Sequence, residues 1–213
     1  TRTARRAIPS GRISPLVALV WGLGLTVAGV LLSNALLPEQ AIFFIVLGWL
    51  IYVPLYTLVL KRHTSMNVVI GGVAGCCPVL AGWAAARADW PVIPFALAMT
   101  VFFWTPAHFW AYSLVHRESY RSAGFPMLSV EQDYAGTAQH ILAHAGMMVL
   151  ASAFAFQGLA LWVALALGLL FVGMSVFLWR RPSSRIAYRL YKVSNYYLVA
   201  VFLALVLGAA LGV

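Results

Sequence analysis

Residues 91–115 read PVIPFALAMTVFFWTPAHFWAYSLV, a run that contains no Asp, Glu, Lys or Arg. An α-helix rises about 1.5 Å per residue, so a run of this length crosses the roughly 30 Å hydrocarbon core of a bilayer. Its apolar residues do not alternate with polar ones, as the strands of a membrane barrel would require. The stretch therefore predicts a transmembrane helix.

Six further runs have the same character. Hydrophobic residues make up 63% of the 213 residues and charged residues only 9%, far from the balance of a soluble domain. We expect an all-α, polytopic membrane bundle that forms a single domain over residues 1–213. Its seven predicted spans are 15–36, 40–60, 68–86, 91–115, 138–156, 159–179 and 193–213.

The basic residues predict the orientation of these spans. If the spans alternate in direction, all but one of the 14 Lys and Arg residues fall at one face, and only Arg87 lies at the other. Basic connections stay on the cytoplasmic side, so the N-terminus and the basic connections are expected there, as in a bacterial inner membrane. The chain has no basic module interleaved with aromatic residues outside the spans, so nucleic acid is not an expected partner.

The basic face also gathers the acidic residues. The connection HRESYRSAGFPMLSVEQD, residues 116–133, holds three of the five carboxylates beside two arginines and a Gly-Phe-Pro turn. Near residue 190, Arg185, Arg189 and Lys192 recur at helical spacing, a stripe suited either to anionic lipid headgroups or to a bound phosphate.

Small residues mark the third span. Gly71 and Gly75 lie four residues apart, a spacing that lets a neighbouring helix or a flat ligand approach the backbone. Asn67 stands where it could cap the start of this helix. Cys76 and Cys77 are adjacent, so they point in different directions and are expected to be packing residues rather than a disulfide or a metal clip.

One titratable residue lies inside the fourth span. A histidine within a membrane helix is costly unless it faces a cavity or a partner. His108 lies just after Pro106, which removes a helical hydrogen bond. The sequence leaves three roles open for His108: contact with haem or metal, proton donation, or a hydrogen bond to a neighbouring helix. His140 and His144 form a second pair, but two ligands do not make a metal site.

Several stretches, taken together and in order, resemble the protoheme IX farnesyltransferases (haem O synthases), which are UbiA-type intramembrane prenyltransferases. The resemblance extends over nearly the whole chain. The matching stretches are the RT at residues 2–3 with the following PSGRI, YTLVLKRHTSMNVVIGGVAGCCPVLAGWAA, FFWTPAHFWAYSL, YRSAGFPMLSV and LYKVSNYYL.

This resemblance implies a bundle of about nine spans around a cavity that opens to the cytoplasm. It also implies a reaction in which farnesyl diphosphate and haem B give haem O, with Mg²⁺ assisting the loss of diphosphate. The product would serve haem–copper oxidase biogenesis, whose assembly factors are possible partners. Such chemistry needs cations for the diphosphate and a dry apolar wall around an allylic cation.

The resemblance also assigns roles by position. The implied catalytic residues are Glu118 and Tyr120, and Glu118 would also be the metal ligand. The implied diphosphate contacts are Arg2, Arg6, Lys61, Arg62, Asn67, Arg117 and Lys192. The implied haem or prenyl pocket contains Trp104, His108 and Trp110.

The chain departs from the family pattern at several positions. Ser119 stands where the family usually has Asp before Tyr120, Ala107 replaces the second residue of a Pro-Pro, and Ala7 follows Arg6 where the family has Pro. The family's first Asp-rich motif would lie just before Arg2, on the second of two helices that we expect to be missing from the 213 residues. Because Mg²⁺ on a diphosphate usually needs more than one carboxylate, we expect this stretch alone to be inactive.

Two other classes of function compete with the enzyme. A non-catalytic descendant that binds haem or an isoprenoid is favoured by Ser119, whereas the basic connections favour the enzyme. A transporter is less well supported, because paired broken helices and acidic residues within the spans are not evident.

Overall fold

The structure, a computed structural model, describes residues 4–211, without the side chain of Ala209. Seven long helices are apolar enough to cross a membrane, which confirms the all-α membrane bundle, and the described residues contain no strand. The long helices are α1 (Pro15–Leu36), α2 (Glu39–Leu50) with its continuations η1 (Ile51–Leu60) and α3 (Lys61–His63), α4 (Asn67–Ala86), α5 (Val92–Val115), α8 (Tyr134–Ala155), α9 (Gly158–Arg180) and α10 (Ser184–Leu211). Two short helices, α6 (Arg117–Ser122) and α7 (Leu128–Glu131), fill the connection after α5.

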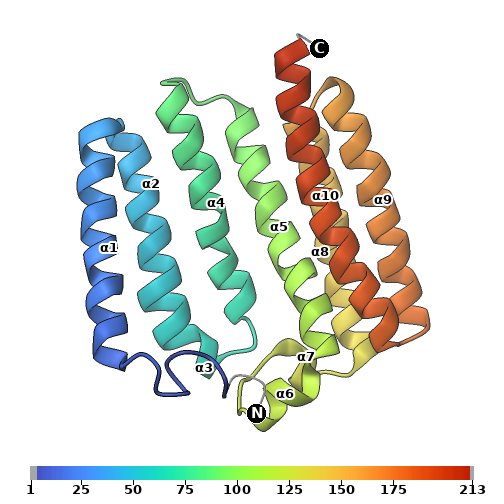
Figure 1. Cartoon of the computed structure of the whole chain (residues 1–213). Coiled ribbons are helices and arrows are strands. Elements are labelled where there is room, and N and C mark those ends of the chain that lie inside the picture. The colour runs from blue at the N-terminus through green and yellow to red at the C-terminus, as the bar shows by residue number, and fades with distance from the viewer. Residues whose placement is uncertain (1–3, 212–213) are drawn as a thin grey trace.

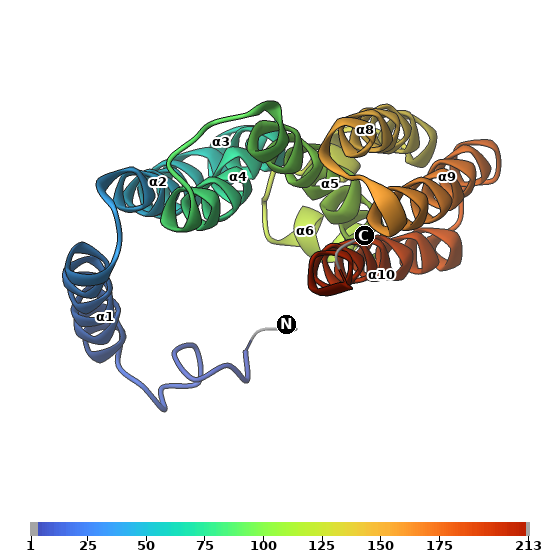
Figure 2. The same ribbon diagram turned by 90° about the horizontal axis from the view of Figure 1, so that it is seen from above.

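The long helices form an open arc around α5. Helix α5 packs against α4 on one side and against α8 and α10 on the other, and α9 joins α8 to α10. Seen from above, α2 and α4 extend the arc away from this group, and α1 stands at its end (Figure 2). Among the described elements α1 contacts only α2, and none of its residues is buried.

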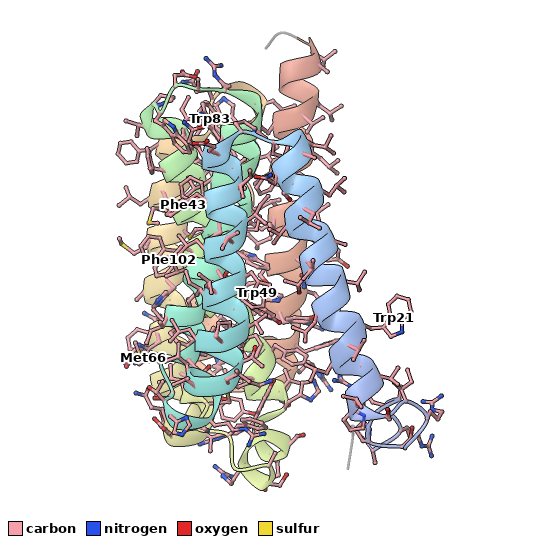
Figure 3. All side chains as sticks on the ribbon, turned by 90° about the vertical axis from the view of Figure 1, so that its left-hand side faces the viewer. Trp21, Phe43, Trp49, Met66, Trp83 and Phe102 are labelled. Atoms are coloured by element: carbon pink, nitrogen blue, oxygen red, sulfur yellow. The ribbon has the colours of Figure 1, made fainter. Side chains whose placement is uncertain are left out.

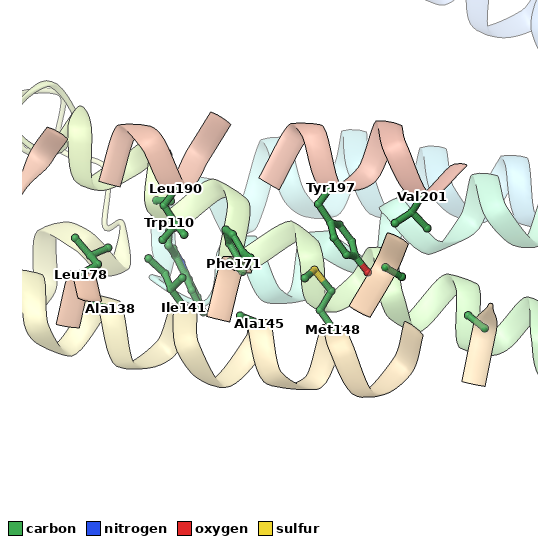
Figure 4. Close-up of a cluster of buried hydrophobic side chains, with 14 of the residues drawn as sticks. Trp110, Ala138, Ile141, Ala145, Met148, Phe171, Leu178, Leu190, Tyr197 and Val201 are labelled. Carbon is green, nitrogen blue, oxygen red and sulfur yellow. The ribbon is translucent and has the colours of Figure 1, made fainter. Parts of the chain in front are cut away.

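The densest packing lies between α5, α8, α9 and α10. Trp110, Ile141, Phe171 and Tyr197, one from each helix, are fully buried and meet in one cluster (Figure 4). Alanines line the same contacts and let the helix backbones come close. Helices in lipid associate through this kind of close van der Waals packing, because burial of apolar surface gains little there.

The outer surface is apolar, as a lipid-facing surface should be. Trp21 on α1 projects away from the bundle with 68% of its surface exposed (Figure 3). Many other large apolar residues are exposed along α1, α2, α9 and α10. In water such a surface would make the protein aggregate, whereas in a membrane it is the surface that contacts the lipid chains.

Two helices begin at least a full turn earlier than the sequence predicts. Helix α8 begins at Tyr134 rather than 138, because the side chain of Asp133 caps it by accepting a hydrogen bond from the Gly136 amide at 2.7 Å. Helix α10 begins at Ser184 rather than 193, so the basic stripe lies within the helix. Long basic side chains tolerate this position because their charged ends reach the membrane surface.

The second span contains a π-helical segment that the sequence analysis did not predict. Pro54 lies inside η1, where its missing N–H and its ring disrupt the regular helical bonds. The hydroxyl of Thr57 donates to the carbonyl of Tyr52, five residues earlier, at 2.7 Å. The rings of Tyr52 and Tyr56 stack with centroids 5.7 Å apart.

The connections divide between two ends of the bundle as the charge pattern predicts. Residues 4–14, α3, α6, α7 and the α9–α10 connection share one end, which we call the basic face (Figure 1). The opposite end carries Arg87, whose guanidinium binds the Asp89 carboxylate at 2.8 Å. This contact holds the pKa of Asp89 below its ordinary value and that of Arg87 above it.

Candidate functional site

An apolar groove runs along the inner side of α2, α4 and α5. It comprises a cavity of about 510 Å³, which reaches up to Phe44, and one of about 240 Å³, which reaches down to Phe109. The two cavities share lining residues, so they lie next to each other along the groove. The shared residues are Tyr52, Gly71, Gly72 and Thr105. A groove of this size and character suits a long apolar ligand.

The glycines of α4 allow both of the uses that the sequence left open. A Cβ on Gly71 would lie 2.5 Å from Cδ2 of Tyr56, so the glycine permits close packing of that ring. A Cβ on Gly75 would lie 3.5 Å from the Thr105 hydroxyl, which is ordinary contact. Both glycines also line the larger cavity, so the same small residues keep the groove open.

The basic face supplies cations at the lower end of this groove. The ring of Tyr120 lies 6.4 Å from that of Phe109, the residue that borders the smaller cavity. Nζ of Lys61 lies 5.4 Å from the centroid of Phe125 in the Gly-Phe-Pro turn. Lys61 and Tyr120, far apart in sequence, therefore both lie on segments that meet at the groove's lower end.

Asn67 joins these two segments from a buried position. Its side-chain Nδ2 donates to the Thr64 carbonyl at 2.6 Å and to the Pro126 carbonyl at 3.5 Å, while Oδ1 is buried without a partner. The expectation that Asn67 caps α4 is wrong, because Asn67 is the first residue of the helix and Met66 occupies the cap position. Its amide instead fixes the turn to the start of α4.

Arg117 is engaged within its own connection. Its Nη2 donates to the Gln132 carbonyl at 2.7 Å, and its guanidinium lies 5.7 Å from the ring centroid of Tyr134. These contacts hold the start of α6 against the start of α8. Arg117 thus shapes the connection that covers the groove's lower end, and part of its guanidinium is bound to Gln132 and Tyr134.

The other predicted anion contacts differ in their surroundings. Arg6 and Arg62 are exposed on the basic face, and Arg2 lies outside the described residues. Lys192 is exposed, with Nζ 4.7 Å from the centroid of the Tyr188 ring. The structure therefore brings Lys61 and Asn67 together around the Gly-Phe-Pro turn. Arg62 and Lys192 are exposed.

The described carboxylates do not gather into a metal site. Glu118 is exposed and pairs with Arg121 at 3.0 Å, and Asp133 caps α8. Within residues 4–211 no three His, Cys, Asp or Glu side chains stand close enough to hold a metal ion. These described residues therefore do not form a binding site for Mg²⁺ by themselves.

A second cluster lies between α5 and α10. Trp104, His108 and Tyr112 lie one turn apart on one face of α5. The indole of Trp104 donates to the Ser194 carbonyl at 2.8 Å, and Nδ1 of His108 lies 2.7 Å from the Ser194 hydroxyl. The rings of Trp104 and His108 stack with centroids 4.3 Å apart.

Trp110 lies apart from this cluster. It is fully buried in the core with α8, where the rings of His140 and His144 meet it edge-on. The resemblance assigns it to the haem or prenyl pocket, but the structure places it on the far side of α5 from Thr105. The ring of His144 is held by a hydrogen bond from Nδ1 to the His140 carbonyl at 2.9 Å.

The comparison with protein families agrees with this architecture. The model of the UbiA prenyltransferase family matches residues 1–205. The chain belongs to that family. A solved structure has a similar fold: the one described as a digeranylgeranylglyceryl phosphate synthase in membranes superposes with a TM-score of 0.79, over 98% of this chain and 75% of that one, at 18% identity.

Individual members of the family are considerably more similar in sequence. Protoheme IX farnesyltransferase 1 of Cenarchaeum symbiosum is 39% identical over 98% of this chain and 72% of its own length. Protoheme IX farnesyltransferase of Chloroflexus aurantiacus is 39% identical over 96% of this chain but only 36% of its own length. The enzyme of that name from Dechloromonas aromatica is 36% identical over 96% of this chain and 70% of its own length.

Sequence reasoning missed Tyr56, Tyr191 and Ser194. Tyr56 lines the smaller cavity, Tyr191 lies 4.8 Å from the His108 ring, and Ser194 holds both Trp104 and His108. Tyr56 begins the stretch YTLVLKRHTSMN, and Tyr191 and Ser194 lie in LYKVSNYYL, so both stretches were noticed as motifs. Only the packing of α5 against α10 and of α4 against η1 reveals what these residues contact.

Proposed function

We propose that this chain serves the reaction named in its relatives, transfer of a farnesyl group to protohaem IX, and that the 213 residues by themselves do not complete it, because their described carboxylates form no metal site. The observation that carries the proposal is 39% identity over 98% of the chain to a protoheme IX farnesyltransferase. In this reaction C1 of farnesyl diphosphate bonds to a vinyl carbon of haem B and diphosphate leaves. Water then supplies a hydroxyl to the other vinyl carbon and loses a proton, which gives haem O.

The geometry divides this task between the basic face and the groove. Lys61, at the lower end of the groove, and the exposed Arg6 and Arg62 on the basic face would bind the diphosphate, because charged hydrogen bonds to phosphate are strong. Lys192 lies on α10 beside Tyr188 and would instead face the haem. The groove from Phe109 to Phe44 would hold the farnesyl chain. Its apolar wall would keep water away from the allylic cation until the new bond forms.

Asn67 and Arg117 would act through the covering connection rather than on the diphosphate. Asn67 holds the Gly-Phe-Pro turn, and Arg117 holds the far end of the same connection against α8. Tyr120 lies between them beside Phe109, where its ring would close the lower end of the groove. Glu118 would have to leave Arg121 before it could take a catalytic role.

The orientation in the membrane belongs to the same proposal. We place the basic face and the N-terminus of this chain on the cytoplasmic side of a bacterial inner membrane. Cys76 and Cys77 are buried, so a cysteine introduced at an exposed site would report its own accessibility. In intact cells an impermeant thiol reagent should label Ala88→Cys and spare Ala123→Cys; the reverse pattern would overturn the orientation.

A second candidate is a non-catalytic protein that binds haem or an isoprenoid. The exposure of Glu118 and its pairing with Arg121 favour this candidate, because this carboxylate is then not poised at the groove. Release of diphosphate from farnesyl diphosphate, measured in proteoliposomes with and without haem B, separates the two. Haem-dependent release supports the enzyme, whereas binding of both compounds without release supports the non-catalytic protein.

A further inference from the structure

The hydrogen bonds around Ser194 determine which nitrogen of His108 carries its proton. The Ser194 hydroxyl lies 2.7 Å from the Tyr191 carbonyl, which can only accept. The single hydroxyl proton is therefore directed at Tyr191, and Ser194 Oγ must accept from its other neighbour. That neighbour is Nδ1 of His108 at 2.7 Å, so Nδ1 carries the hydrogen. The remaining nitrogen, Nε2, then presents a lone pair.

Nε2 of His108 is available to a ligand. Within the described residues it has no hydrogen-bond partner, because the one bond of this ring comes from Nδ1. Unlike the unpaired Nε1 of Trp110, it is not fully buried, so Nε2 retains some accessible surface. The half-buried ring therefore keeps one basic nitrogen accessible.

The ring is also held in a fixed orientation. Trp104 stacks on it at 4.3 Å with an interplanar angle of 17°, and Tyr191 lies 4.8 Å from it. Trp104 is itself anchored by its indole N–H to the Ser194 carbonyl. A histidine whose Nδ1–H is bound by the protein and whose Nε2 is free is the usual arrangement of a metal-ligating histidine.

An aromatic strip leads from His108 to the basic face. Tyr191 stacks on Tyr188 with centroids 6.3 Å apart, and Nζ of Lys192 lies 4.7 Å from the Tyr188 ring. On the α5 side, Tyr112 lies 5.1 Å from Tyr191. A flat macrocycle bearing two carboxylates would find aromatic surface along this strip and a cation at its end.

We propose that Nε2 of His108 binds the iron of the haem substrate, and that Ser194 is the positioning residue that holds this nitrogen unprotonated. The inference rests on the proposed function, since it requires that haem is bound here. It differs from the role of Trp104 and His108 as a wall, because it assigns a bond from one nitrogen to the iron. The groove beside α4 then remains for the farnesyl chain.

The test measures haem binding and iron ligation without turnover. Purified protein in detergent would be titrated with haem and examined by absorption and electron paramagnetic resonance. His108→Ala should lose the histidine-ligated signature and bind haem at least tenfold more weakly, and added imidazole should restore the signature. Ser194→Ala should weaken binding about tenfold, the lower end of the range for such positioning partners.

A matched control is available on α8. His144 also lies within a span and also uses Nδ1 in a hydrogen bond, so His144→Ala should leave the spectrum unchanged and the affinity within twofold. If His108→Ala does not fold, His108→Met should replace the histidine signature with that of a thioether ligand.

The outcomes separate this inference from the proposed function. Wild-type protein that binds haem with a signature unaltered in His108→Ala, or unaltered in His108→Met, would overturn the ligand assignment alone. Haem binding lost equally in His144→Ala would also overturn it. Wild-type protein that binds no haem would contradict the proposed function and with it the inference.

Discussion

Gly71→Ala tests whether the groove depends on the contact between α4 and η1. The new Cβ would lie 2.5 Å from Cδ2 and 3.1 Å from Cγ of Tyr56. Ordinary contact begins near 3.4 Å, so the ring or the helix must move by about 0.9 Å. The atoms in conflict belong to the ring rather than to a flexible end, so relief requires the whole ring or the helix to shift.

The loss of unfolding free energy in Gly71→Ala can be compared with that of a control variant on the same helix. Overpacking of this kind destabilises by about 1–3 kcal/mol, whereas Gly→Ala inside a helix stabilises by roughly 0.5–1 kcal/mol. Gly82 is exposed on α4, and a Cβ there meets nothing within 4 Å. Gly82→Ala should therefore be neutral or stabilising. The free energy of unfolding of Gly71→Ala should be about 1–3 kcal/mol lower than that of Gly82→Ala.

Thermal unfolding in detergent can be followed through the protein's own thiols. Cys76 and Cys77 are buried, so a thiol-reactive dye reports their exposure on unfolding. At about 2–4 °C per kcal/mol, Gly71→Ala should unfold several degrees below Gly82→Ala. It should also raise the KM for farnesyl diphosphate, because Tyr56 and Gly71 both line the smaller cavity. Equal unfolding temperatures for the two variants would refute the packing argument.

Three further variants test the basic face. Lys61→Ala should raise the KM for farnesyl diphosphate about tenfold, which corresponds to a loss of about 1.4 kcal/mol of binding free energy. Arg87→Ala, at the opposite end of the bundle, should leave this KM unchanged. Equal effects of the two variants would show that Lys61 does not bind the diphosphate. Asp133→Ala removes the cap on the Gly136 amide and should cost about 1 kcal/mol in unfolding free energy, a prediction that an unchanged unfolding temperature contradicts. Asn67→Ala should speed hydrogen exchange in residues 124–127, because the 3.5 Å bond to the Pro126 carbonyl is lost, and unaltered exchange there would count against its bridging role.

The sequence predicts the spans well because the bilayer imposes a length and a composition on each of them. The predicted first span coincides with α1, and the others agree except where polar residues continue a helix. Hydropathy predicts the start of α10 nine residues too late, because Arg185 and Arg189 make its first turns as polar as a loop. A charged residue at a helix end is compatible with the membrane surface, so hydropathy alone underestimates such helices.

The candidate site was predicted less completely because its contacts cross between spans. Lys61 and Tyr120 were recognised from their motifs, and both lie on segments at the lower end of the groove. Trp110 shares a motif with His108, yet residues two apart on a helix point to nearly opposite sides, and the Trp110 ring enters the core. The roles of Ser194 and Tyr191 depend on which face α10 presents to α5, and a single sequence does not specify this.

In the proposed reaction, farnesyl and water both become bonded to the haem macrocycle. Mass spectrometry can show this on the haem recovered after the protein, purified from its own cells, is incubated with haem B and farnesyl diphosphate in ¹⁸O-labelled water. The recovered haem should have gained one farnesyl group and one labelled hydroxyl. Recovery of unmodified haem B, or a farnesyl group on another acceptor, would contradict it.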